Sequence, residues 1–179
     1  MDFINKIDAD ILLWIQEYLR NGILTPIMKF ITHLGDAGLM WIAIALLLLC
    51  FKKTRKVGAM CACALVMSLL INNVILKPLI ARVRPYEVID GLVLLVKKAH
   101  DFSFPSGHTA SSFACAVVIF KQMPKKYGIP ALVMAFIMGF TRLYVGIHYP
   151  TDVLAAIVTG TLCAIIGMKI VDTIIAKRR

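Results

Sequence analysis

The feature that most constrains this chain is a series of apolar segments, each long enough to form a helix. They occupy residues 37–51, 57–76, 109–120, 128–141 and 153–168. The chain as a whole is 60% hydrophobic and only 17% charged, whereas a typical soluble domain carries roughly 25% charged residues. We therefore expect a membrane protein. We expect a single domain over residues 1–179, because no linker, low-complexity tract or internal repeat divides the chain.

The segments favour helices, because none shows the strict alternation of a membrane β-strand. Several reach the roughly 20 residues of a span only with their polar flanks, so functional polar groups are expected at span ends. A weaker sixth span is expected at residues 21–34, which Pro26 and Lys29 interrupt. Residues 1–20 are amphipathic and too polar to span. The predicted fold is an all-α integral membrane protein, a six-transmembrane-helix bundle over residues 21–179 with an N-terminal amphipathic interfacial helix over residues 1–20.

Charge in the connecting loops predicts the orientation, because short loops rich in Lys and Arg stay cytoplasmic. Three basic groups should share the inner side: Lys52, Lys53, Arg55 and Lys56; Lys121, Lys125 and Lys126; Lys177, Arg178 and Arg179. With six spans they do, and the loops at 35–36, 77–108 and 142–152 lie outside. These outer loops nevertheless contain Lys77, Arg82, Arg84, Lys97, Lys98 and Arg142. The exception indicates an outer site that needs positive charge.

Three short motifs lie in these outer loops. The stretch KPLIARVRP at residues 77–85 separates Lys77 from Arg84 by six residues. PSGH follows at residues 105–108. The stretch TRLYVGIHYPTD at residues 141–152 separates Arg142 from His148 by five residues and places Asp152 four residues after His148. All three motifs are expected on one face of the membrane.

In this order and spacing, the motifs resemble the signature of the type 2 phosphatidic acid phosphatase superfamily, K-x6-RP, PSGH and SR-x5-H-x3-D. The one departure is Thr141, where the family has Ser. The motifs span residues 77–152, which is less than half of the chain. The resemblance implies a membrane lipid phosphatase that works without a metal or another cofactor.

The residue types suit a phosphoryl group, whose transfer depends on positioning and electrostatic stabilisation. Lys77, Arg84 and Arg142 supply cations, and the planar fork of Arg can contact two phosphate oxygens at once. Ser106 is a natural N-cap for the span that follows. The free backbone N–H groups there, including that of Gly107, are expected to form an anion site. These five residues are the predicted phosphate-binding set.

The resemblance also implies the catalytic roles. His148 is the nucleophile, which attacks phosphorus through Nε2 while Asp152 holds its Nδ1 proton. The product of that step is a phosphohistidine. His108 then protonates the leaving lipid oxygen, and its conjugate base helps to activate the hydrolytic water.

The motifs recognise phosphate and leave the lipid open. The expected outer site, the small chain and the basic inner face resemble bacterial members that act on undecaprenyl diphosphate or phosphatidylglycerophosphate. We favour undecaprenyl diphosphate, a cell-wall lipid carrier, at the bacterial inner membrane. A phosphatidylglycerophosphate or phosphatidate phosphatase is the alternative. A non-enzymatic transporter or binding protein for anions or lipid phosphates is a further one, although the predicted spans carry little charge.

Other polar residues have simpler interpretations. His33 and His100 are expected to be structural, and Arg82 is expected to contact lipid headgroups. The apolar stretch at residues 88–96 is too short to span and is expected to enter the outer leaflet beside the substrate. The cysteines lack zinc-site spacing. Nothing indicates a nucleic-acid partner.

Overall fold

The structure is a computed structural model that describes residues 3–177, and within this range it is helical with no strand. The helices are α1 (Phe3–Trp14), α2 (Leu24–Leu34), α3 (Leu39–Cys50), α4 (Arg55–Ser68), α5 (Lys77–Ile80), α6 (Pro85–Val88), α7 (Gly107–Gln122), α8 (Lys125–Tyr144) and α9 (Pro150–Ala176). Two π-helices, η1 (Ile15–Leu19) and η3 (Leu69–Leu76), continue α1 and α4. A short 3₁₀ turn, η2 (Asp36–Gly38), joins α2 to α3.

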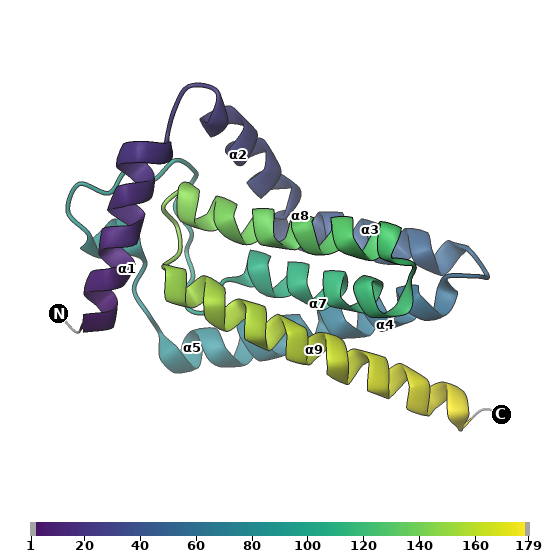
Figure 1. The fold of residues 1–179 in the computed structure, drawn as a ribbon. Coiled ribbons are helices and arrows are strands. Elements are labelled where there is room, and N and C mark those ends of the chain that lie inside the picture. Colours follow the sequence, from purple (N-terminus) through teal and green to yellow (C-terminus); the bar gives the residue numbers. More distant parts are fainter. Residues whose placement is uncertain (1–2, 178–179) are drawn as a thin grey trace.

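Helix α7 lies at the centre of the bundle, between α4, α8 and α9 (Figure 1). Its residues from Ala114 to Ile119 are all buried, and their side chains are small or apolar with no amphipathic pattern. Gly160 of α9 permits a close crossing, because a Cβ there would lie 2.5 Å from the carbonyl oxygen of Ala110. Small residues at such contacts are typical of helices that pack within membranes. The start of α7 is thereby fixed against its neighbours.

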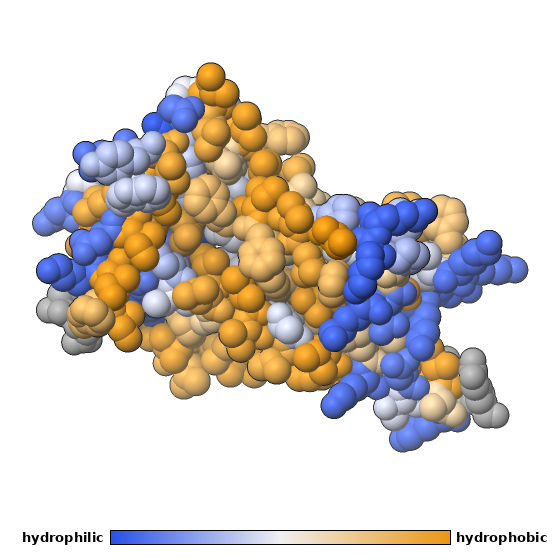
Figure 2. Space-filling view, in the orientation of Figure 1, coloured by the Kyte–Doolittle hydropathy of each residue, from blue (hydrophilic) through white to orange (hydrophobic). Residues whose placement is uncertain are grey.

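The outer surface of the bundle is apolar. Figure 2 shows an orange band over the middle of the molecule, with hydrophilic side chains gathered towards its ends. Exposed residues in this region include Leu46, Leu69, Phe136, Leu154 and Leu162. An apolar surface this large is not expected to face water.

Length and composition identify three candidate spans, Arg55–Val88, α8 and α9. Helix α2 and the segment Asp36–Cys50 pass the same test together but are bent by 48°, so the candidate number rises to four if the pair counts as one span. Helix α7 has 16 residues and is shorter than these. The predicted all-α class is confirmed for residues 3–177. The six-span count and the interfacial position of residues 1–20 stay predictions.

Helix α1 crosses one end of the bundle, and the outer loop packs beneath it (Figure 1). Leu92 is buried against Leu12 and Tyr149, and Leu95 packs near Ile15. The Arg20 side chain donates to the carbonyl oxygen of Val93 at 2.7 Å. Within the apolar stretch at residues 88–96, Leu92 is thus covered by the protein, whereas Val88 and Val93 are exposed. The expected entry of this stretch into the outer leaflet stays a prediction.

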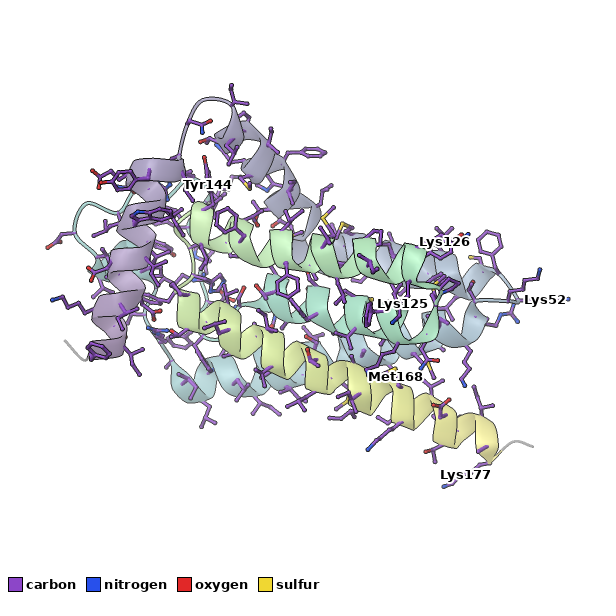
Figure 3. All side chains as sticks on the ribbon, viewed as in Figure 1. Lys52, Lys125, Lys126, Tyr144, Met168 and Lys177 are labelled. Atoms are coloured by element: carbon purple, nitrogen blue, oxygen red, sulfur yellow. The ribbon has the colours of Figure 1, made fainter. Side chains whose placement is uncertain are left out.

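The predicted inner charges gather at the opposite end of the bundle. Figure 3 shows Lys52, Lys125, Lys126 and Lys177 there, far from Tyr144 at the other end of α8. The chain segments that carry these lysines therefore lie at one end of the bundle, as the charge pattern predicts. Arg178 and Arg179, also part of that prediction, lie outside the described residues.

Candidate active site

A cavity of about 620 Å³ opens beside the start of α7 and brings most of the predicted site residues together. Its polar lining includes Lys77, Arg84, Gly107, His108, Arg142 and His148. These residues come from α5, the segment before α6, α7, α8 and the connection to α9. Ser106 and Asp152 do not line the cavity but support residues that do.

Local backbone features direct the first two cations into the cavity. The π-helix η3 ends immediately before Lys77, and such turns often occur at functional sites. The chain then reverses at Ala81, whose φ of 48° is left-handed. Arg84 is extended because Pro85 follows it. Lys77 and Arg84 are only 6% and 4% exposed. Such burial is unusual for cations and requires anionic partners.

Asp101 of the outer loop supplies the partner for both cations. One of its oxygens accepts a bond from Nζ of Lys77, and the other accepts from Nη2 of Arg84 at 2.5 Å. Burial by itself would raise the pKa of Asp101, but the bond and charge of Lys77, with those of Arg84, lower that pKa to about 2. The Asp101 carboxylate thus binds the two cations that the sequence predicts to bind phosphate. The motifs did not predict this carboxylate.

Arg142 reaches the cavity from the last turn of α8. Its Nη1 donates to Oγ1 of Thr32 at 2.5 Å. Its Nε is buried and has no hydrogen-bond partner within residues 3–177. Buried guanidinium N–H groups are almost always satisfied, so this one marks a place where an anion fits.

The start of α7 has the expected anion-site architecture. Ser106 is the N-cap, and its Oγ accepts from the backbone N–H of Thr109 at 3.5 Å and from the Thr109 hydroxyl at 3.0 Å. The N-cap prediction is confirmed. At Gly107 a Cβ would lie 3.2 Å from Oδ1 of Asn73, so glycine allows η3 to approach closely. Free N–H groups at this helix end face the cavity that Gly107 lines.

His148 lies between the cations and Asp152. Its Nε2 is 3.4 Å from Nη1 of Arg84, and its Nδ1 is 3.4 Å from Oδ2 of Asp152. The second contact lacks hydrogen-bond geometry, and Nδ1 has no other partner in the described part of the chain. Burial lowers the pKa of His148 to about 3; Asp152 opposes that shift, and Arg84 and Arg142 add to it. The imidazole is therefore neutral at physiological pH, with Nε2 facing the cationic end.

Asp152 is held by more groups than the motif indicated. Its Oδ2 accepts from the Ser103 hydroxyl at 2.5 Å and from the backbone N–H of Tyr149 at 3.0 Å. Its Oδ1 accepts from Nη1 of Arg82 at 2.7 Å. Arg82 also donates to Asp8 of α1 at 2.8 Å. Arg82, expected at lipid headgroups, instead links the N-terminal helix to the Asp152 carboxylate, because α1 brings the buried acid Asp8 to it.

His108 has a carboxylate of its own, which the motifs did not reveal. Its Nε2 lies 3.0 Å from Oδ1 of Asp36, the first residue of η2. A short Asp-containing turn between α2 and α3 gives no sequence signal of that pairing. The contact joins residues 72 positions apart.

Thr141, the one departure from the signature, does not contact the other site residues. Its hydroxyl donates to the carbonyl oxygen of Met138 at 2.7 Å, one turn back in α8. The side chain is buried. Thr, like the family's Ser, carries a hydroxyl donor, and the structure directs that donor to the helix backbone.

Much of the remaining lining of the cavity is apolar. Ile42 and Leu46 of α3 line one side, and Leu65, Val66 and Leu69 of α4 and η3 line the other. A ligand that fits both parts would carry an anionic group and a long hydrocarbon chain. Within residues 3–177, no group of three His, Cys, Asp or Glu side chains lies close enough to hold a metal ion. The positive charge of the cavity comes from the side chains of Lys77, Arg84 and Arg142.

The protein is a helical bundle whose cavity joins buried cations to an apolar wall. This arrangement fits the class of lipid phosphatases, and the family comparison agrees. The family model of the PAP2 superfamily matches residues 56–176. The chain belongs to this superfamily and is a lipid phosphatase enzyme. Its candidate spans and its transmembrane relatives make it a multi-pass membrane protein.

Individual relatives carry different substrate names. The chain is 31% identical over 156 residues to an undecaprenyl-diphosphatase of Sulfolobus acidocaldarius, covering 87% of this chain and 75% of the relative. It is 30% identical over 173 residues to a lipid A 4'-phosphatase of Bacteroides thetaiotaomicron, covering 89% and 75%. Among solved structures, a PAP2-type phosphatidylglycerolphosphate phosphatase of Bacillus subtilis matches with a TM-score of 0.79 at 29% identity, covering 97% of this chain and 89% of that one.

Proposed function

We propose that the protein hydrolyses undecaprenyl diphosphate to undecaprenyl phosphate and phosphate, through a phosphohistidine and without a metal. The observation that carries the proposal is the cavity itself. It joins buried Lys77, Arg84 and Arg142 to an apolar wall formed by α3, α4 and η3. A relative that shares 31% identity carries the name of this activity.

The first chemical step uses His148. Its neutral imidazole offers a lone pair on Nε2, which attacks the terminal phosphorus while the bond from phosphorus to the bridging oxygen breaks. Charge that develops on the phosphoryl oxygens is stabilised by Lys77, Arg84 and Arg142, and by the N–H groups at the start of α7. Asp152 balances the positive charge that His148 acquires as the nitrogen–phosphorus bond forms.

His108 serves the leaving group. It gives a proton to the bridging oxygen, so undecaprenyl phosphate departs. In the second step a water attacks the phosphohistidine, its proton returns to His108, and the nitrogen–phosphorus bond breaks. Phosphate leaves, and both histidines regain their starting states.

The test is phosphate release by purified protein in detergent, with undecaprenyl diphosphate, phosphatidylglycerophosphate, phosphatidate and lipid A as substrates. We expect the highest kcat/KM on undecaprenyl diphosphate. His148→Ala should abolish turnover and remove an acid-labile phosphoenzyme, whereas His100→Ala, in the exposed outer loop, should change neither. A preference for phosphatidylglycerophosphate would replace the substrate but keep the mechanism. Full activity in His148→Ala would overturn the mechanism.

We also propose six spans, an interfacial α1 and a site that faces the outside of a bacterial inner membrane. The basic inner loops and the opposite position of the cavity support this orientation. In a Cys50→Ser background, chosen because Cys50 is exposed, a membrane-impermeant thiol reagent should label Lys97→Cys in intact cells. It should label Lys53→Cys only after the membrane is opened. The reverse pattern would place the site in the cytoplasm.

A further inference from the structure

The corner between α2 and α3, residues 33–38, is built against His108. At Gly35 a Cβ would lie 2.8 Å from Cδ2 of His108 and 2.7 Å from Sδ of Met138, so only glycine lets the corner approach this closely. Ala37 and Gly38 follow with left-handed φ values of 51° and 73°. Non-glycine residues rarely adopt such values, and they cluster at functional sites. The corner has a fixed shape that brings η2 to the histidine.

Asp36 makes the contact for which this shape is suited. Its Oδ1 lies 3.0 Å from Nε2 of His108, and its Oδ2 lies 2.9 Å from Nδ1 of His33. The His108 side chain is 17% exposed, whereas those of Asp36 and His33 are 53% and 57% exposed. The carboxylate thus reaches from the outer surface to a histidine that lines the cavity. Both of its oxygens have a histidine partner.

We propose that Asp36 is the positioning residue of the general acid: it orients His108 through Nε2 and stabilises the protonated imidazole, while His33 fixes the Asp36 side chain. This inference rests on the proposed function, in which His108 protonates the leaving oxygen. Asp36 itself does not touch the reacting atoms. It acts through His108.

The charges around His108 explain why the acid needs such a partner. Burial lowers the pKa of His108 to about 4, and the positive charges of Arg142 in α8 and Lys77 in α5 add to that shift, whereas Asp36 opposes it. Asp101 is engaged by Lys77 and Arg84. Asp36 is the carboxylate that contacts His108 directly, and His33 contacts the other oxygen of Asp36. Loss of Asp36 would therefore favour the neutral imidazole, which cannot act as an acid, still further.

The arrangement also assigns the ring atoms. Since Nε2 is held by Asp36, the proton that reaches the leaving oxygen comes from Nδ1 of His108. After that transfer the neutral Nδ1 accepts the proton of the hydrolytic water, whose oxygen bonds to phosphorus as the bond to His148 breaks. His108 loses and regains one proton in each turnover. Each histidine of the site therefore has its own carboxylate, Asp36 for the acid and Asp152 for the nucleophile.

The experiment compares Asp36→Asn with the wild type on two substrates, in the purified full-length protein. Undecaprenyl diphosphate needs a protonated leaving group, whereas 4-nitrophenyl phosphate does not. We expect kcat on the lipid to fall about 10- to 100-fold, part of the roughly 10² to 10⁴ that general acid catalysis contributes. On 4-nitrophenyl phosphate it should fall less than about threefold. The alkaline limb of the lipid kcat profile should move to lower pH, because the protonated imidazole has lost its anionic partner.

Three further variants separate positioning from structural support. Asp36→Glu keeps the charge and should retain the wild-type alkaline limb. His33→Gln should lower lipid kcat by only about twofold to fivefold, since it frees the Asp36 side chain without removing the charge. Asp10→Asn removes an exposed carboxylate of α1 outside the cavity and should leave both activities unchanged.

The proposal requires both the selective loss on the lipid and the moved alkaline limb. Equal losses on both substrates, or an unmoved limb, would overturn it, as would lipid activity within twofold of the wild type. Thermal unfolding is followed for every variant, and Asp36→Ser replaces Asp36→Asn, with the same expectations, if the latter does not fold. A wild type that releases no phosphate from either substrate would instead overturn the proposed function.

Discussion

The two ends of this bundle both concentrate positive charge, but they do so in opposite ways. At one end, Lys52, Lys125 and Lys126 gather on the exposed surface (Figure 3). At the other end, Lys77, Arg84 and Arg142 are each at most 6% exposed and line a cavity. Solvated lysines cost little and orient a membrane protein. Buried cations are expensive unless an anion compensates them, so the comparison supports the proposed roles, orientation at one end and phosphate chemistry at the other.

The strongest test of this contrast removes one cation from each end. Arg84→Ala should lower kcat/KM by roughly 10² to 10³, the usual cost of losing one preorganised donor to a developing anion. Arg84→Lys should recover only part of that loss, because Lys cannot reproduce the fork that contacts Asp101 and the backbone. Lys53→Ala, at the exposed end, should stay within about twofold. Phosphate release from undecaprenyl diphosphate measures all three. Equal effects at both ends would remove the distinction.

A partly buried cation outside the cavity sharpens the comparison. Arg82 does not line the cavity but bonds both Asp8 and Asp152. Arg82→Ala should therefore lower kcat about 10- to 100-fold through Asp152, as loss of an outer partner commonly does. It should also destabilise the fold by about 3 kcal/mol, because it leaves Asp8 buried without its cation.

Asp8→Asn separates the two effects of Arg82, because it disturbs α1 without removing the bond between Arg82 and Asp152. We expect a lower Tm with kcat within about threefold of the wild type. A fall in kcat as large as that of Arg82→Ala would mean that α1 itself, rather than Arg82, controls Asp152.

These pairings also mark the limit of what could be predicted from the sequence. Most residues of the predicted site do line one cavity, because each motif is a local pattern at a helix end and helices converge there; their catalytic and phosphate-binding roles stay predictions. Asp36 and Asp8 were not found, because their partners lie 72 and 74 residues away and depend on how the corner and α1 pack. The burial of Leu92 under α1 was not predicted for the same reason, since hydropathy alone does not show whether a helix or a lipid covers an apolar side chain.

A smaller effect is expected from a substitution of Asp101, which contacts the buried cations of the cavity. It holds Lys77 and Arg84, so a phosphate must displace it. Asp101→Asn should strengthen inhibition by vanadate about twofold to fivefold, since a half-exposed ion pair is worth up to roughly 1 kcal/mol. Because the pKa of Asp101 is lowered to about 2, the carboxylate is ionised throughout the working range. The gain should therefore be the same at pH 5 and pH 8. Weaker vanadate inhibition in Asp101→Asn would show that this carboxylate supports anion binding rather than competing with it.

The smallest expected effect concerns Thr141, which lies next to a buried cation yet does not belong to the cationic site. Its hydroxyl donates to the carbonyl oxygen of Met138, so neither Thr141→Ser nor Thr141→Val should change kcat/KM by more than about twofold. Thr141→Ser removes one buried methyl group and should cost roughly 1 kcal/mol of stability. Thr141→Val retains the shape but loses the bond within α8. If the hydroxyl instead contacts phosphate in the Michaelis complex, Thr141→Val alone should lose tenfold or more while Thr141→Ser remains active. That result would add Thr141, the residue before Arg142 in α8, to the phosphate-binding residues.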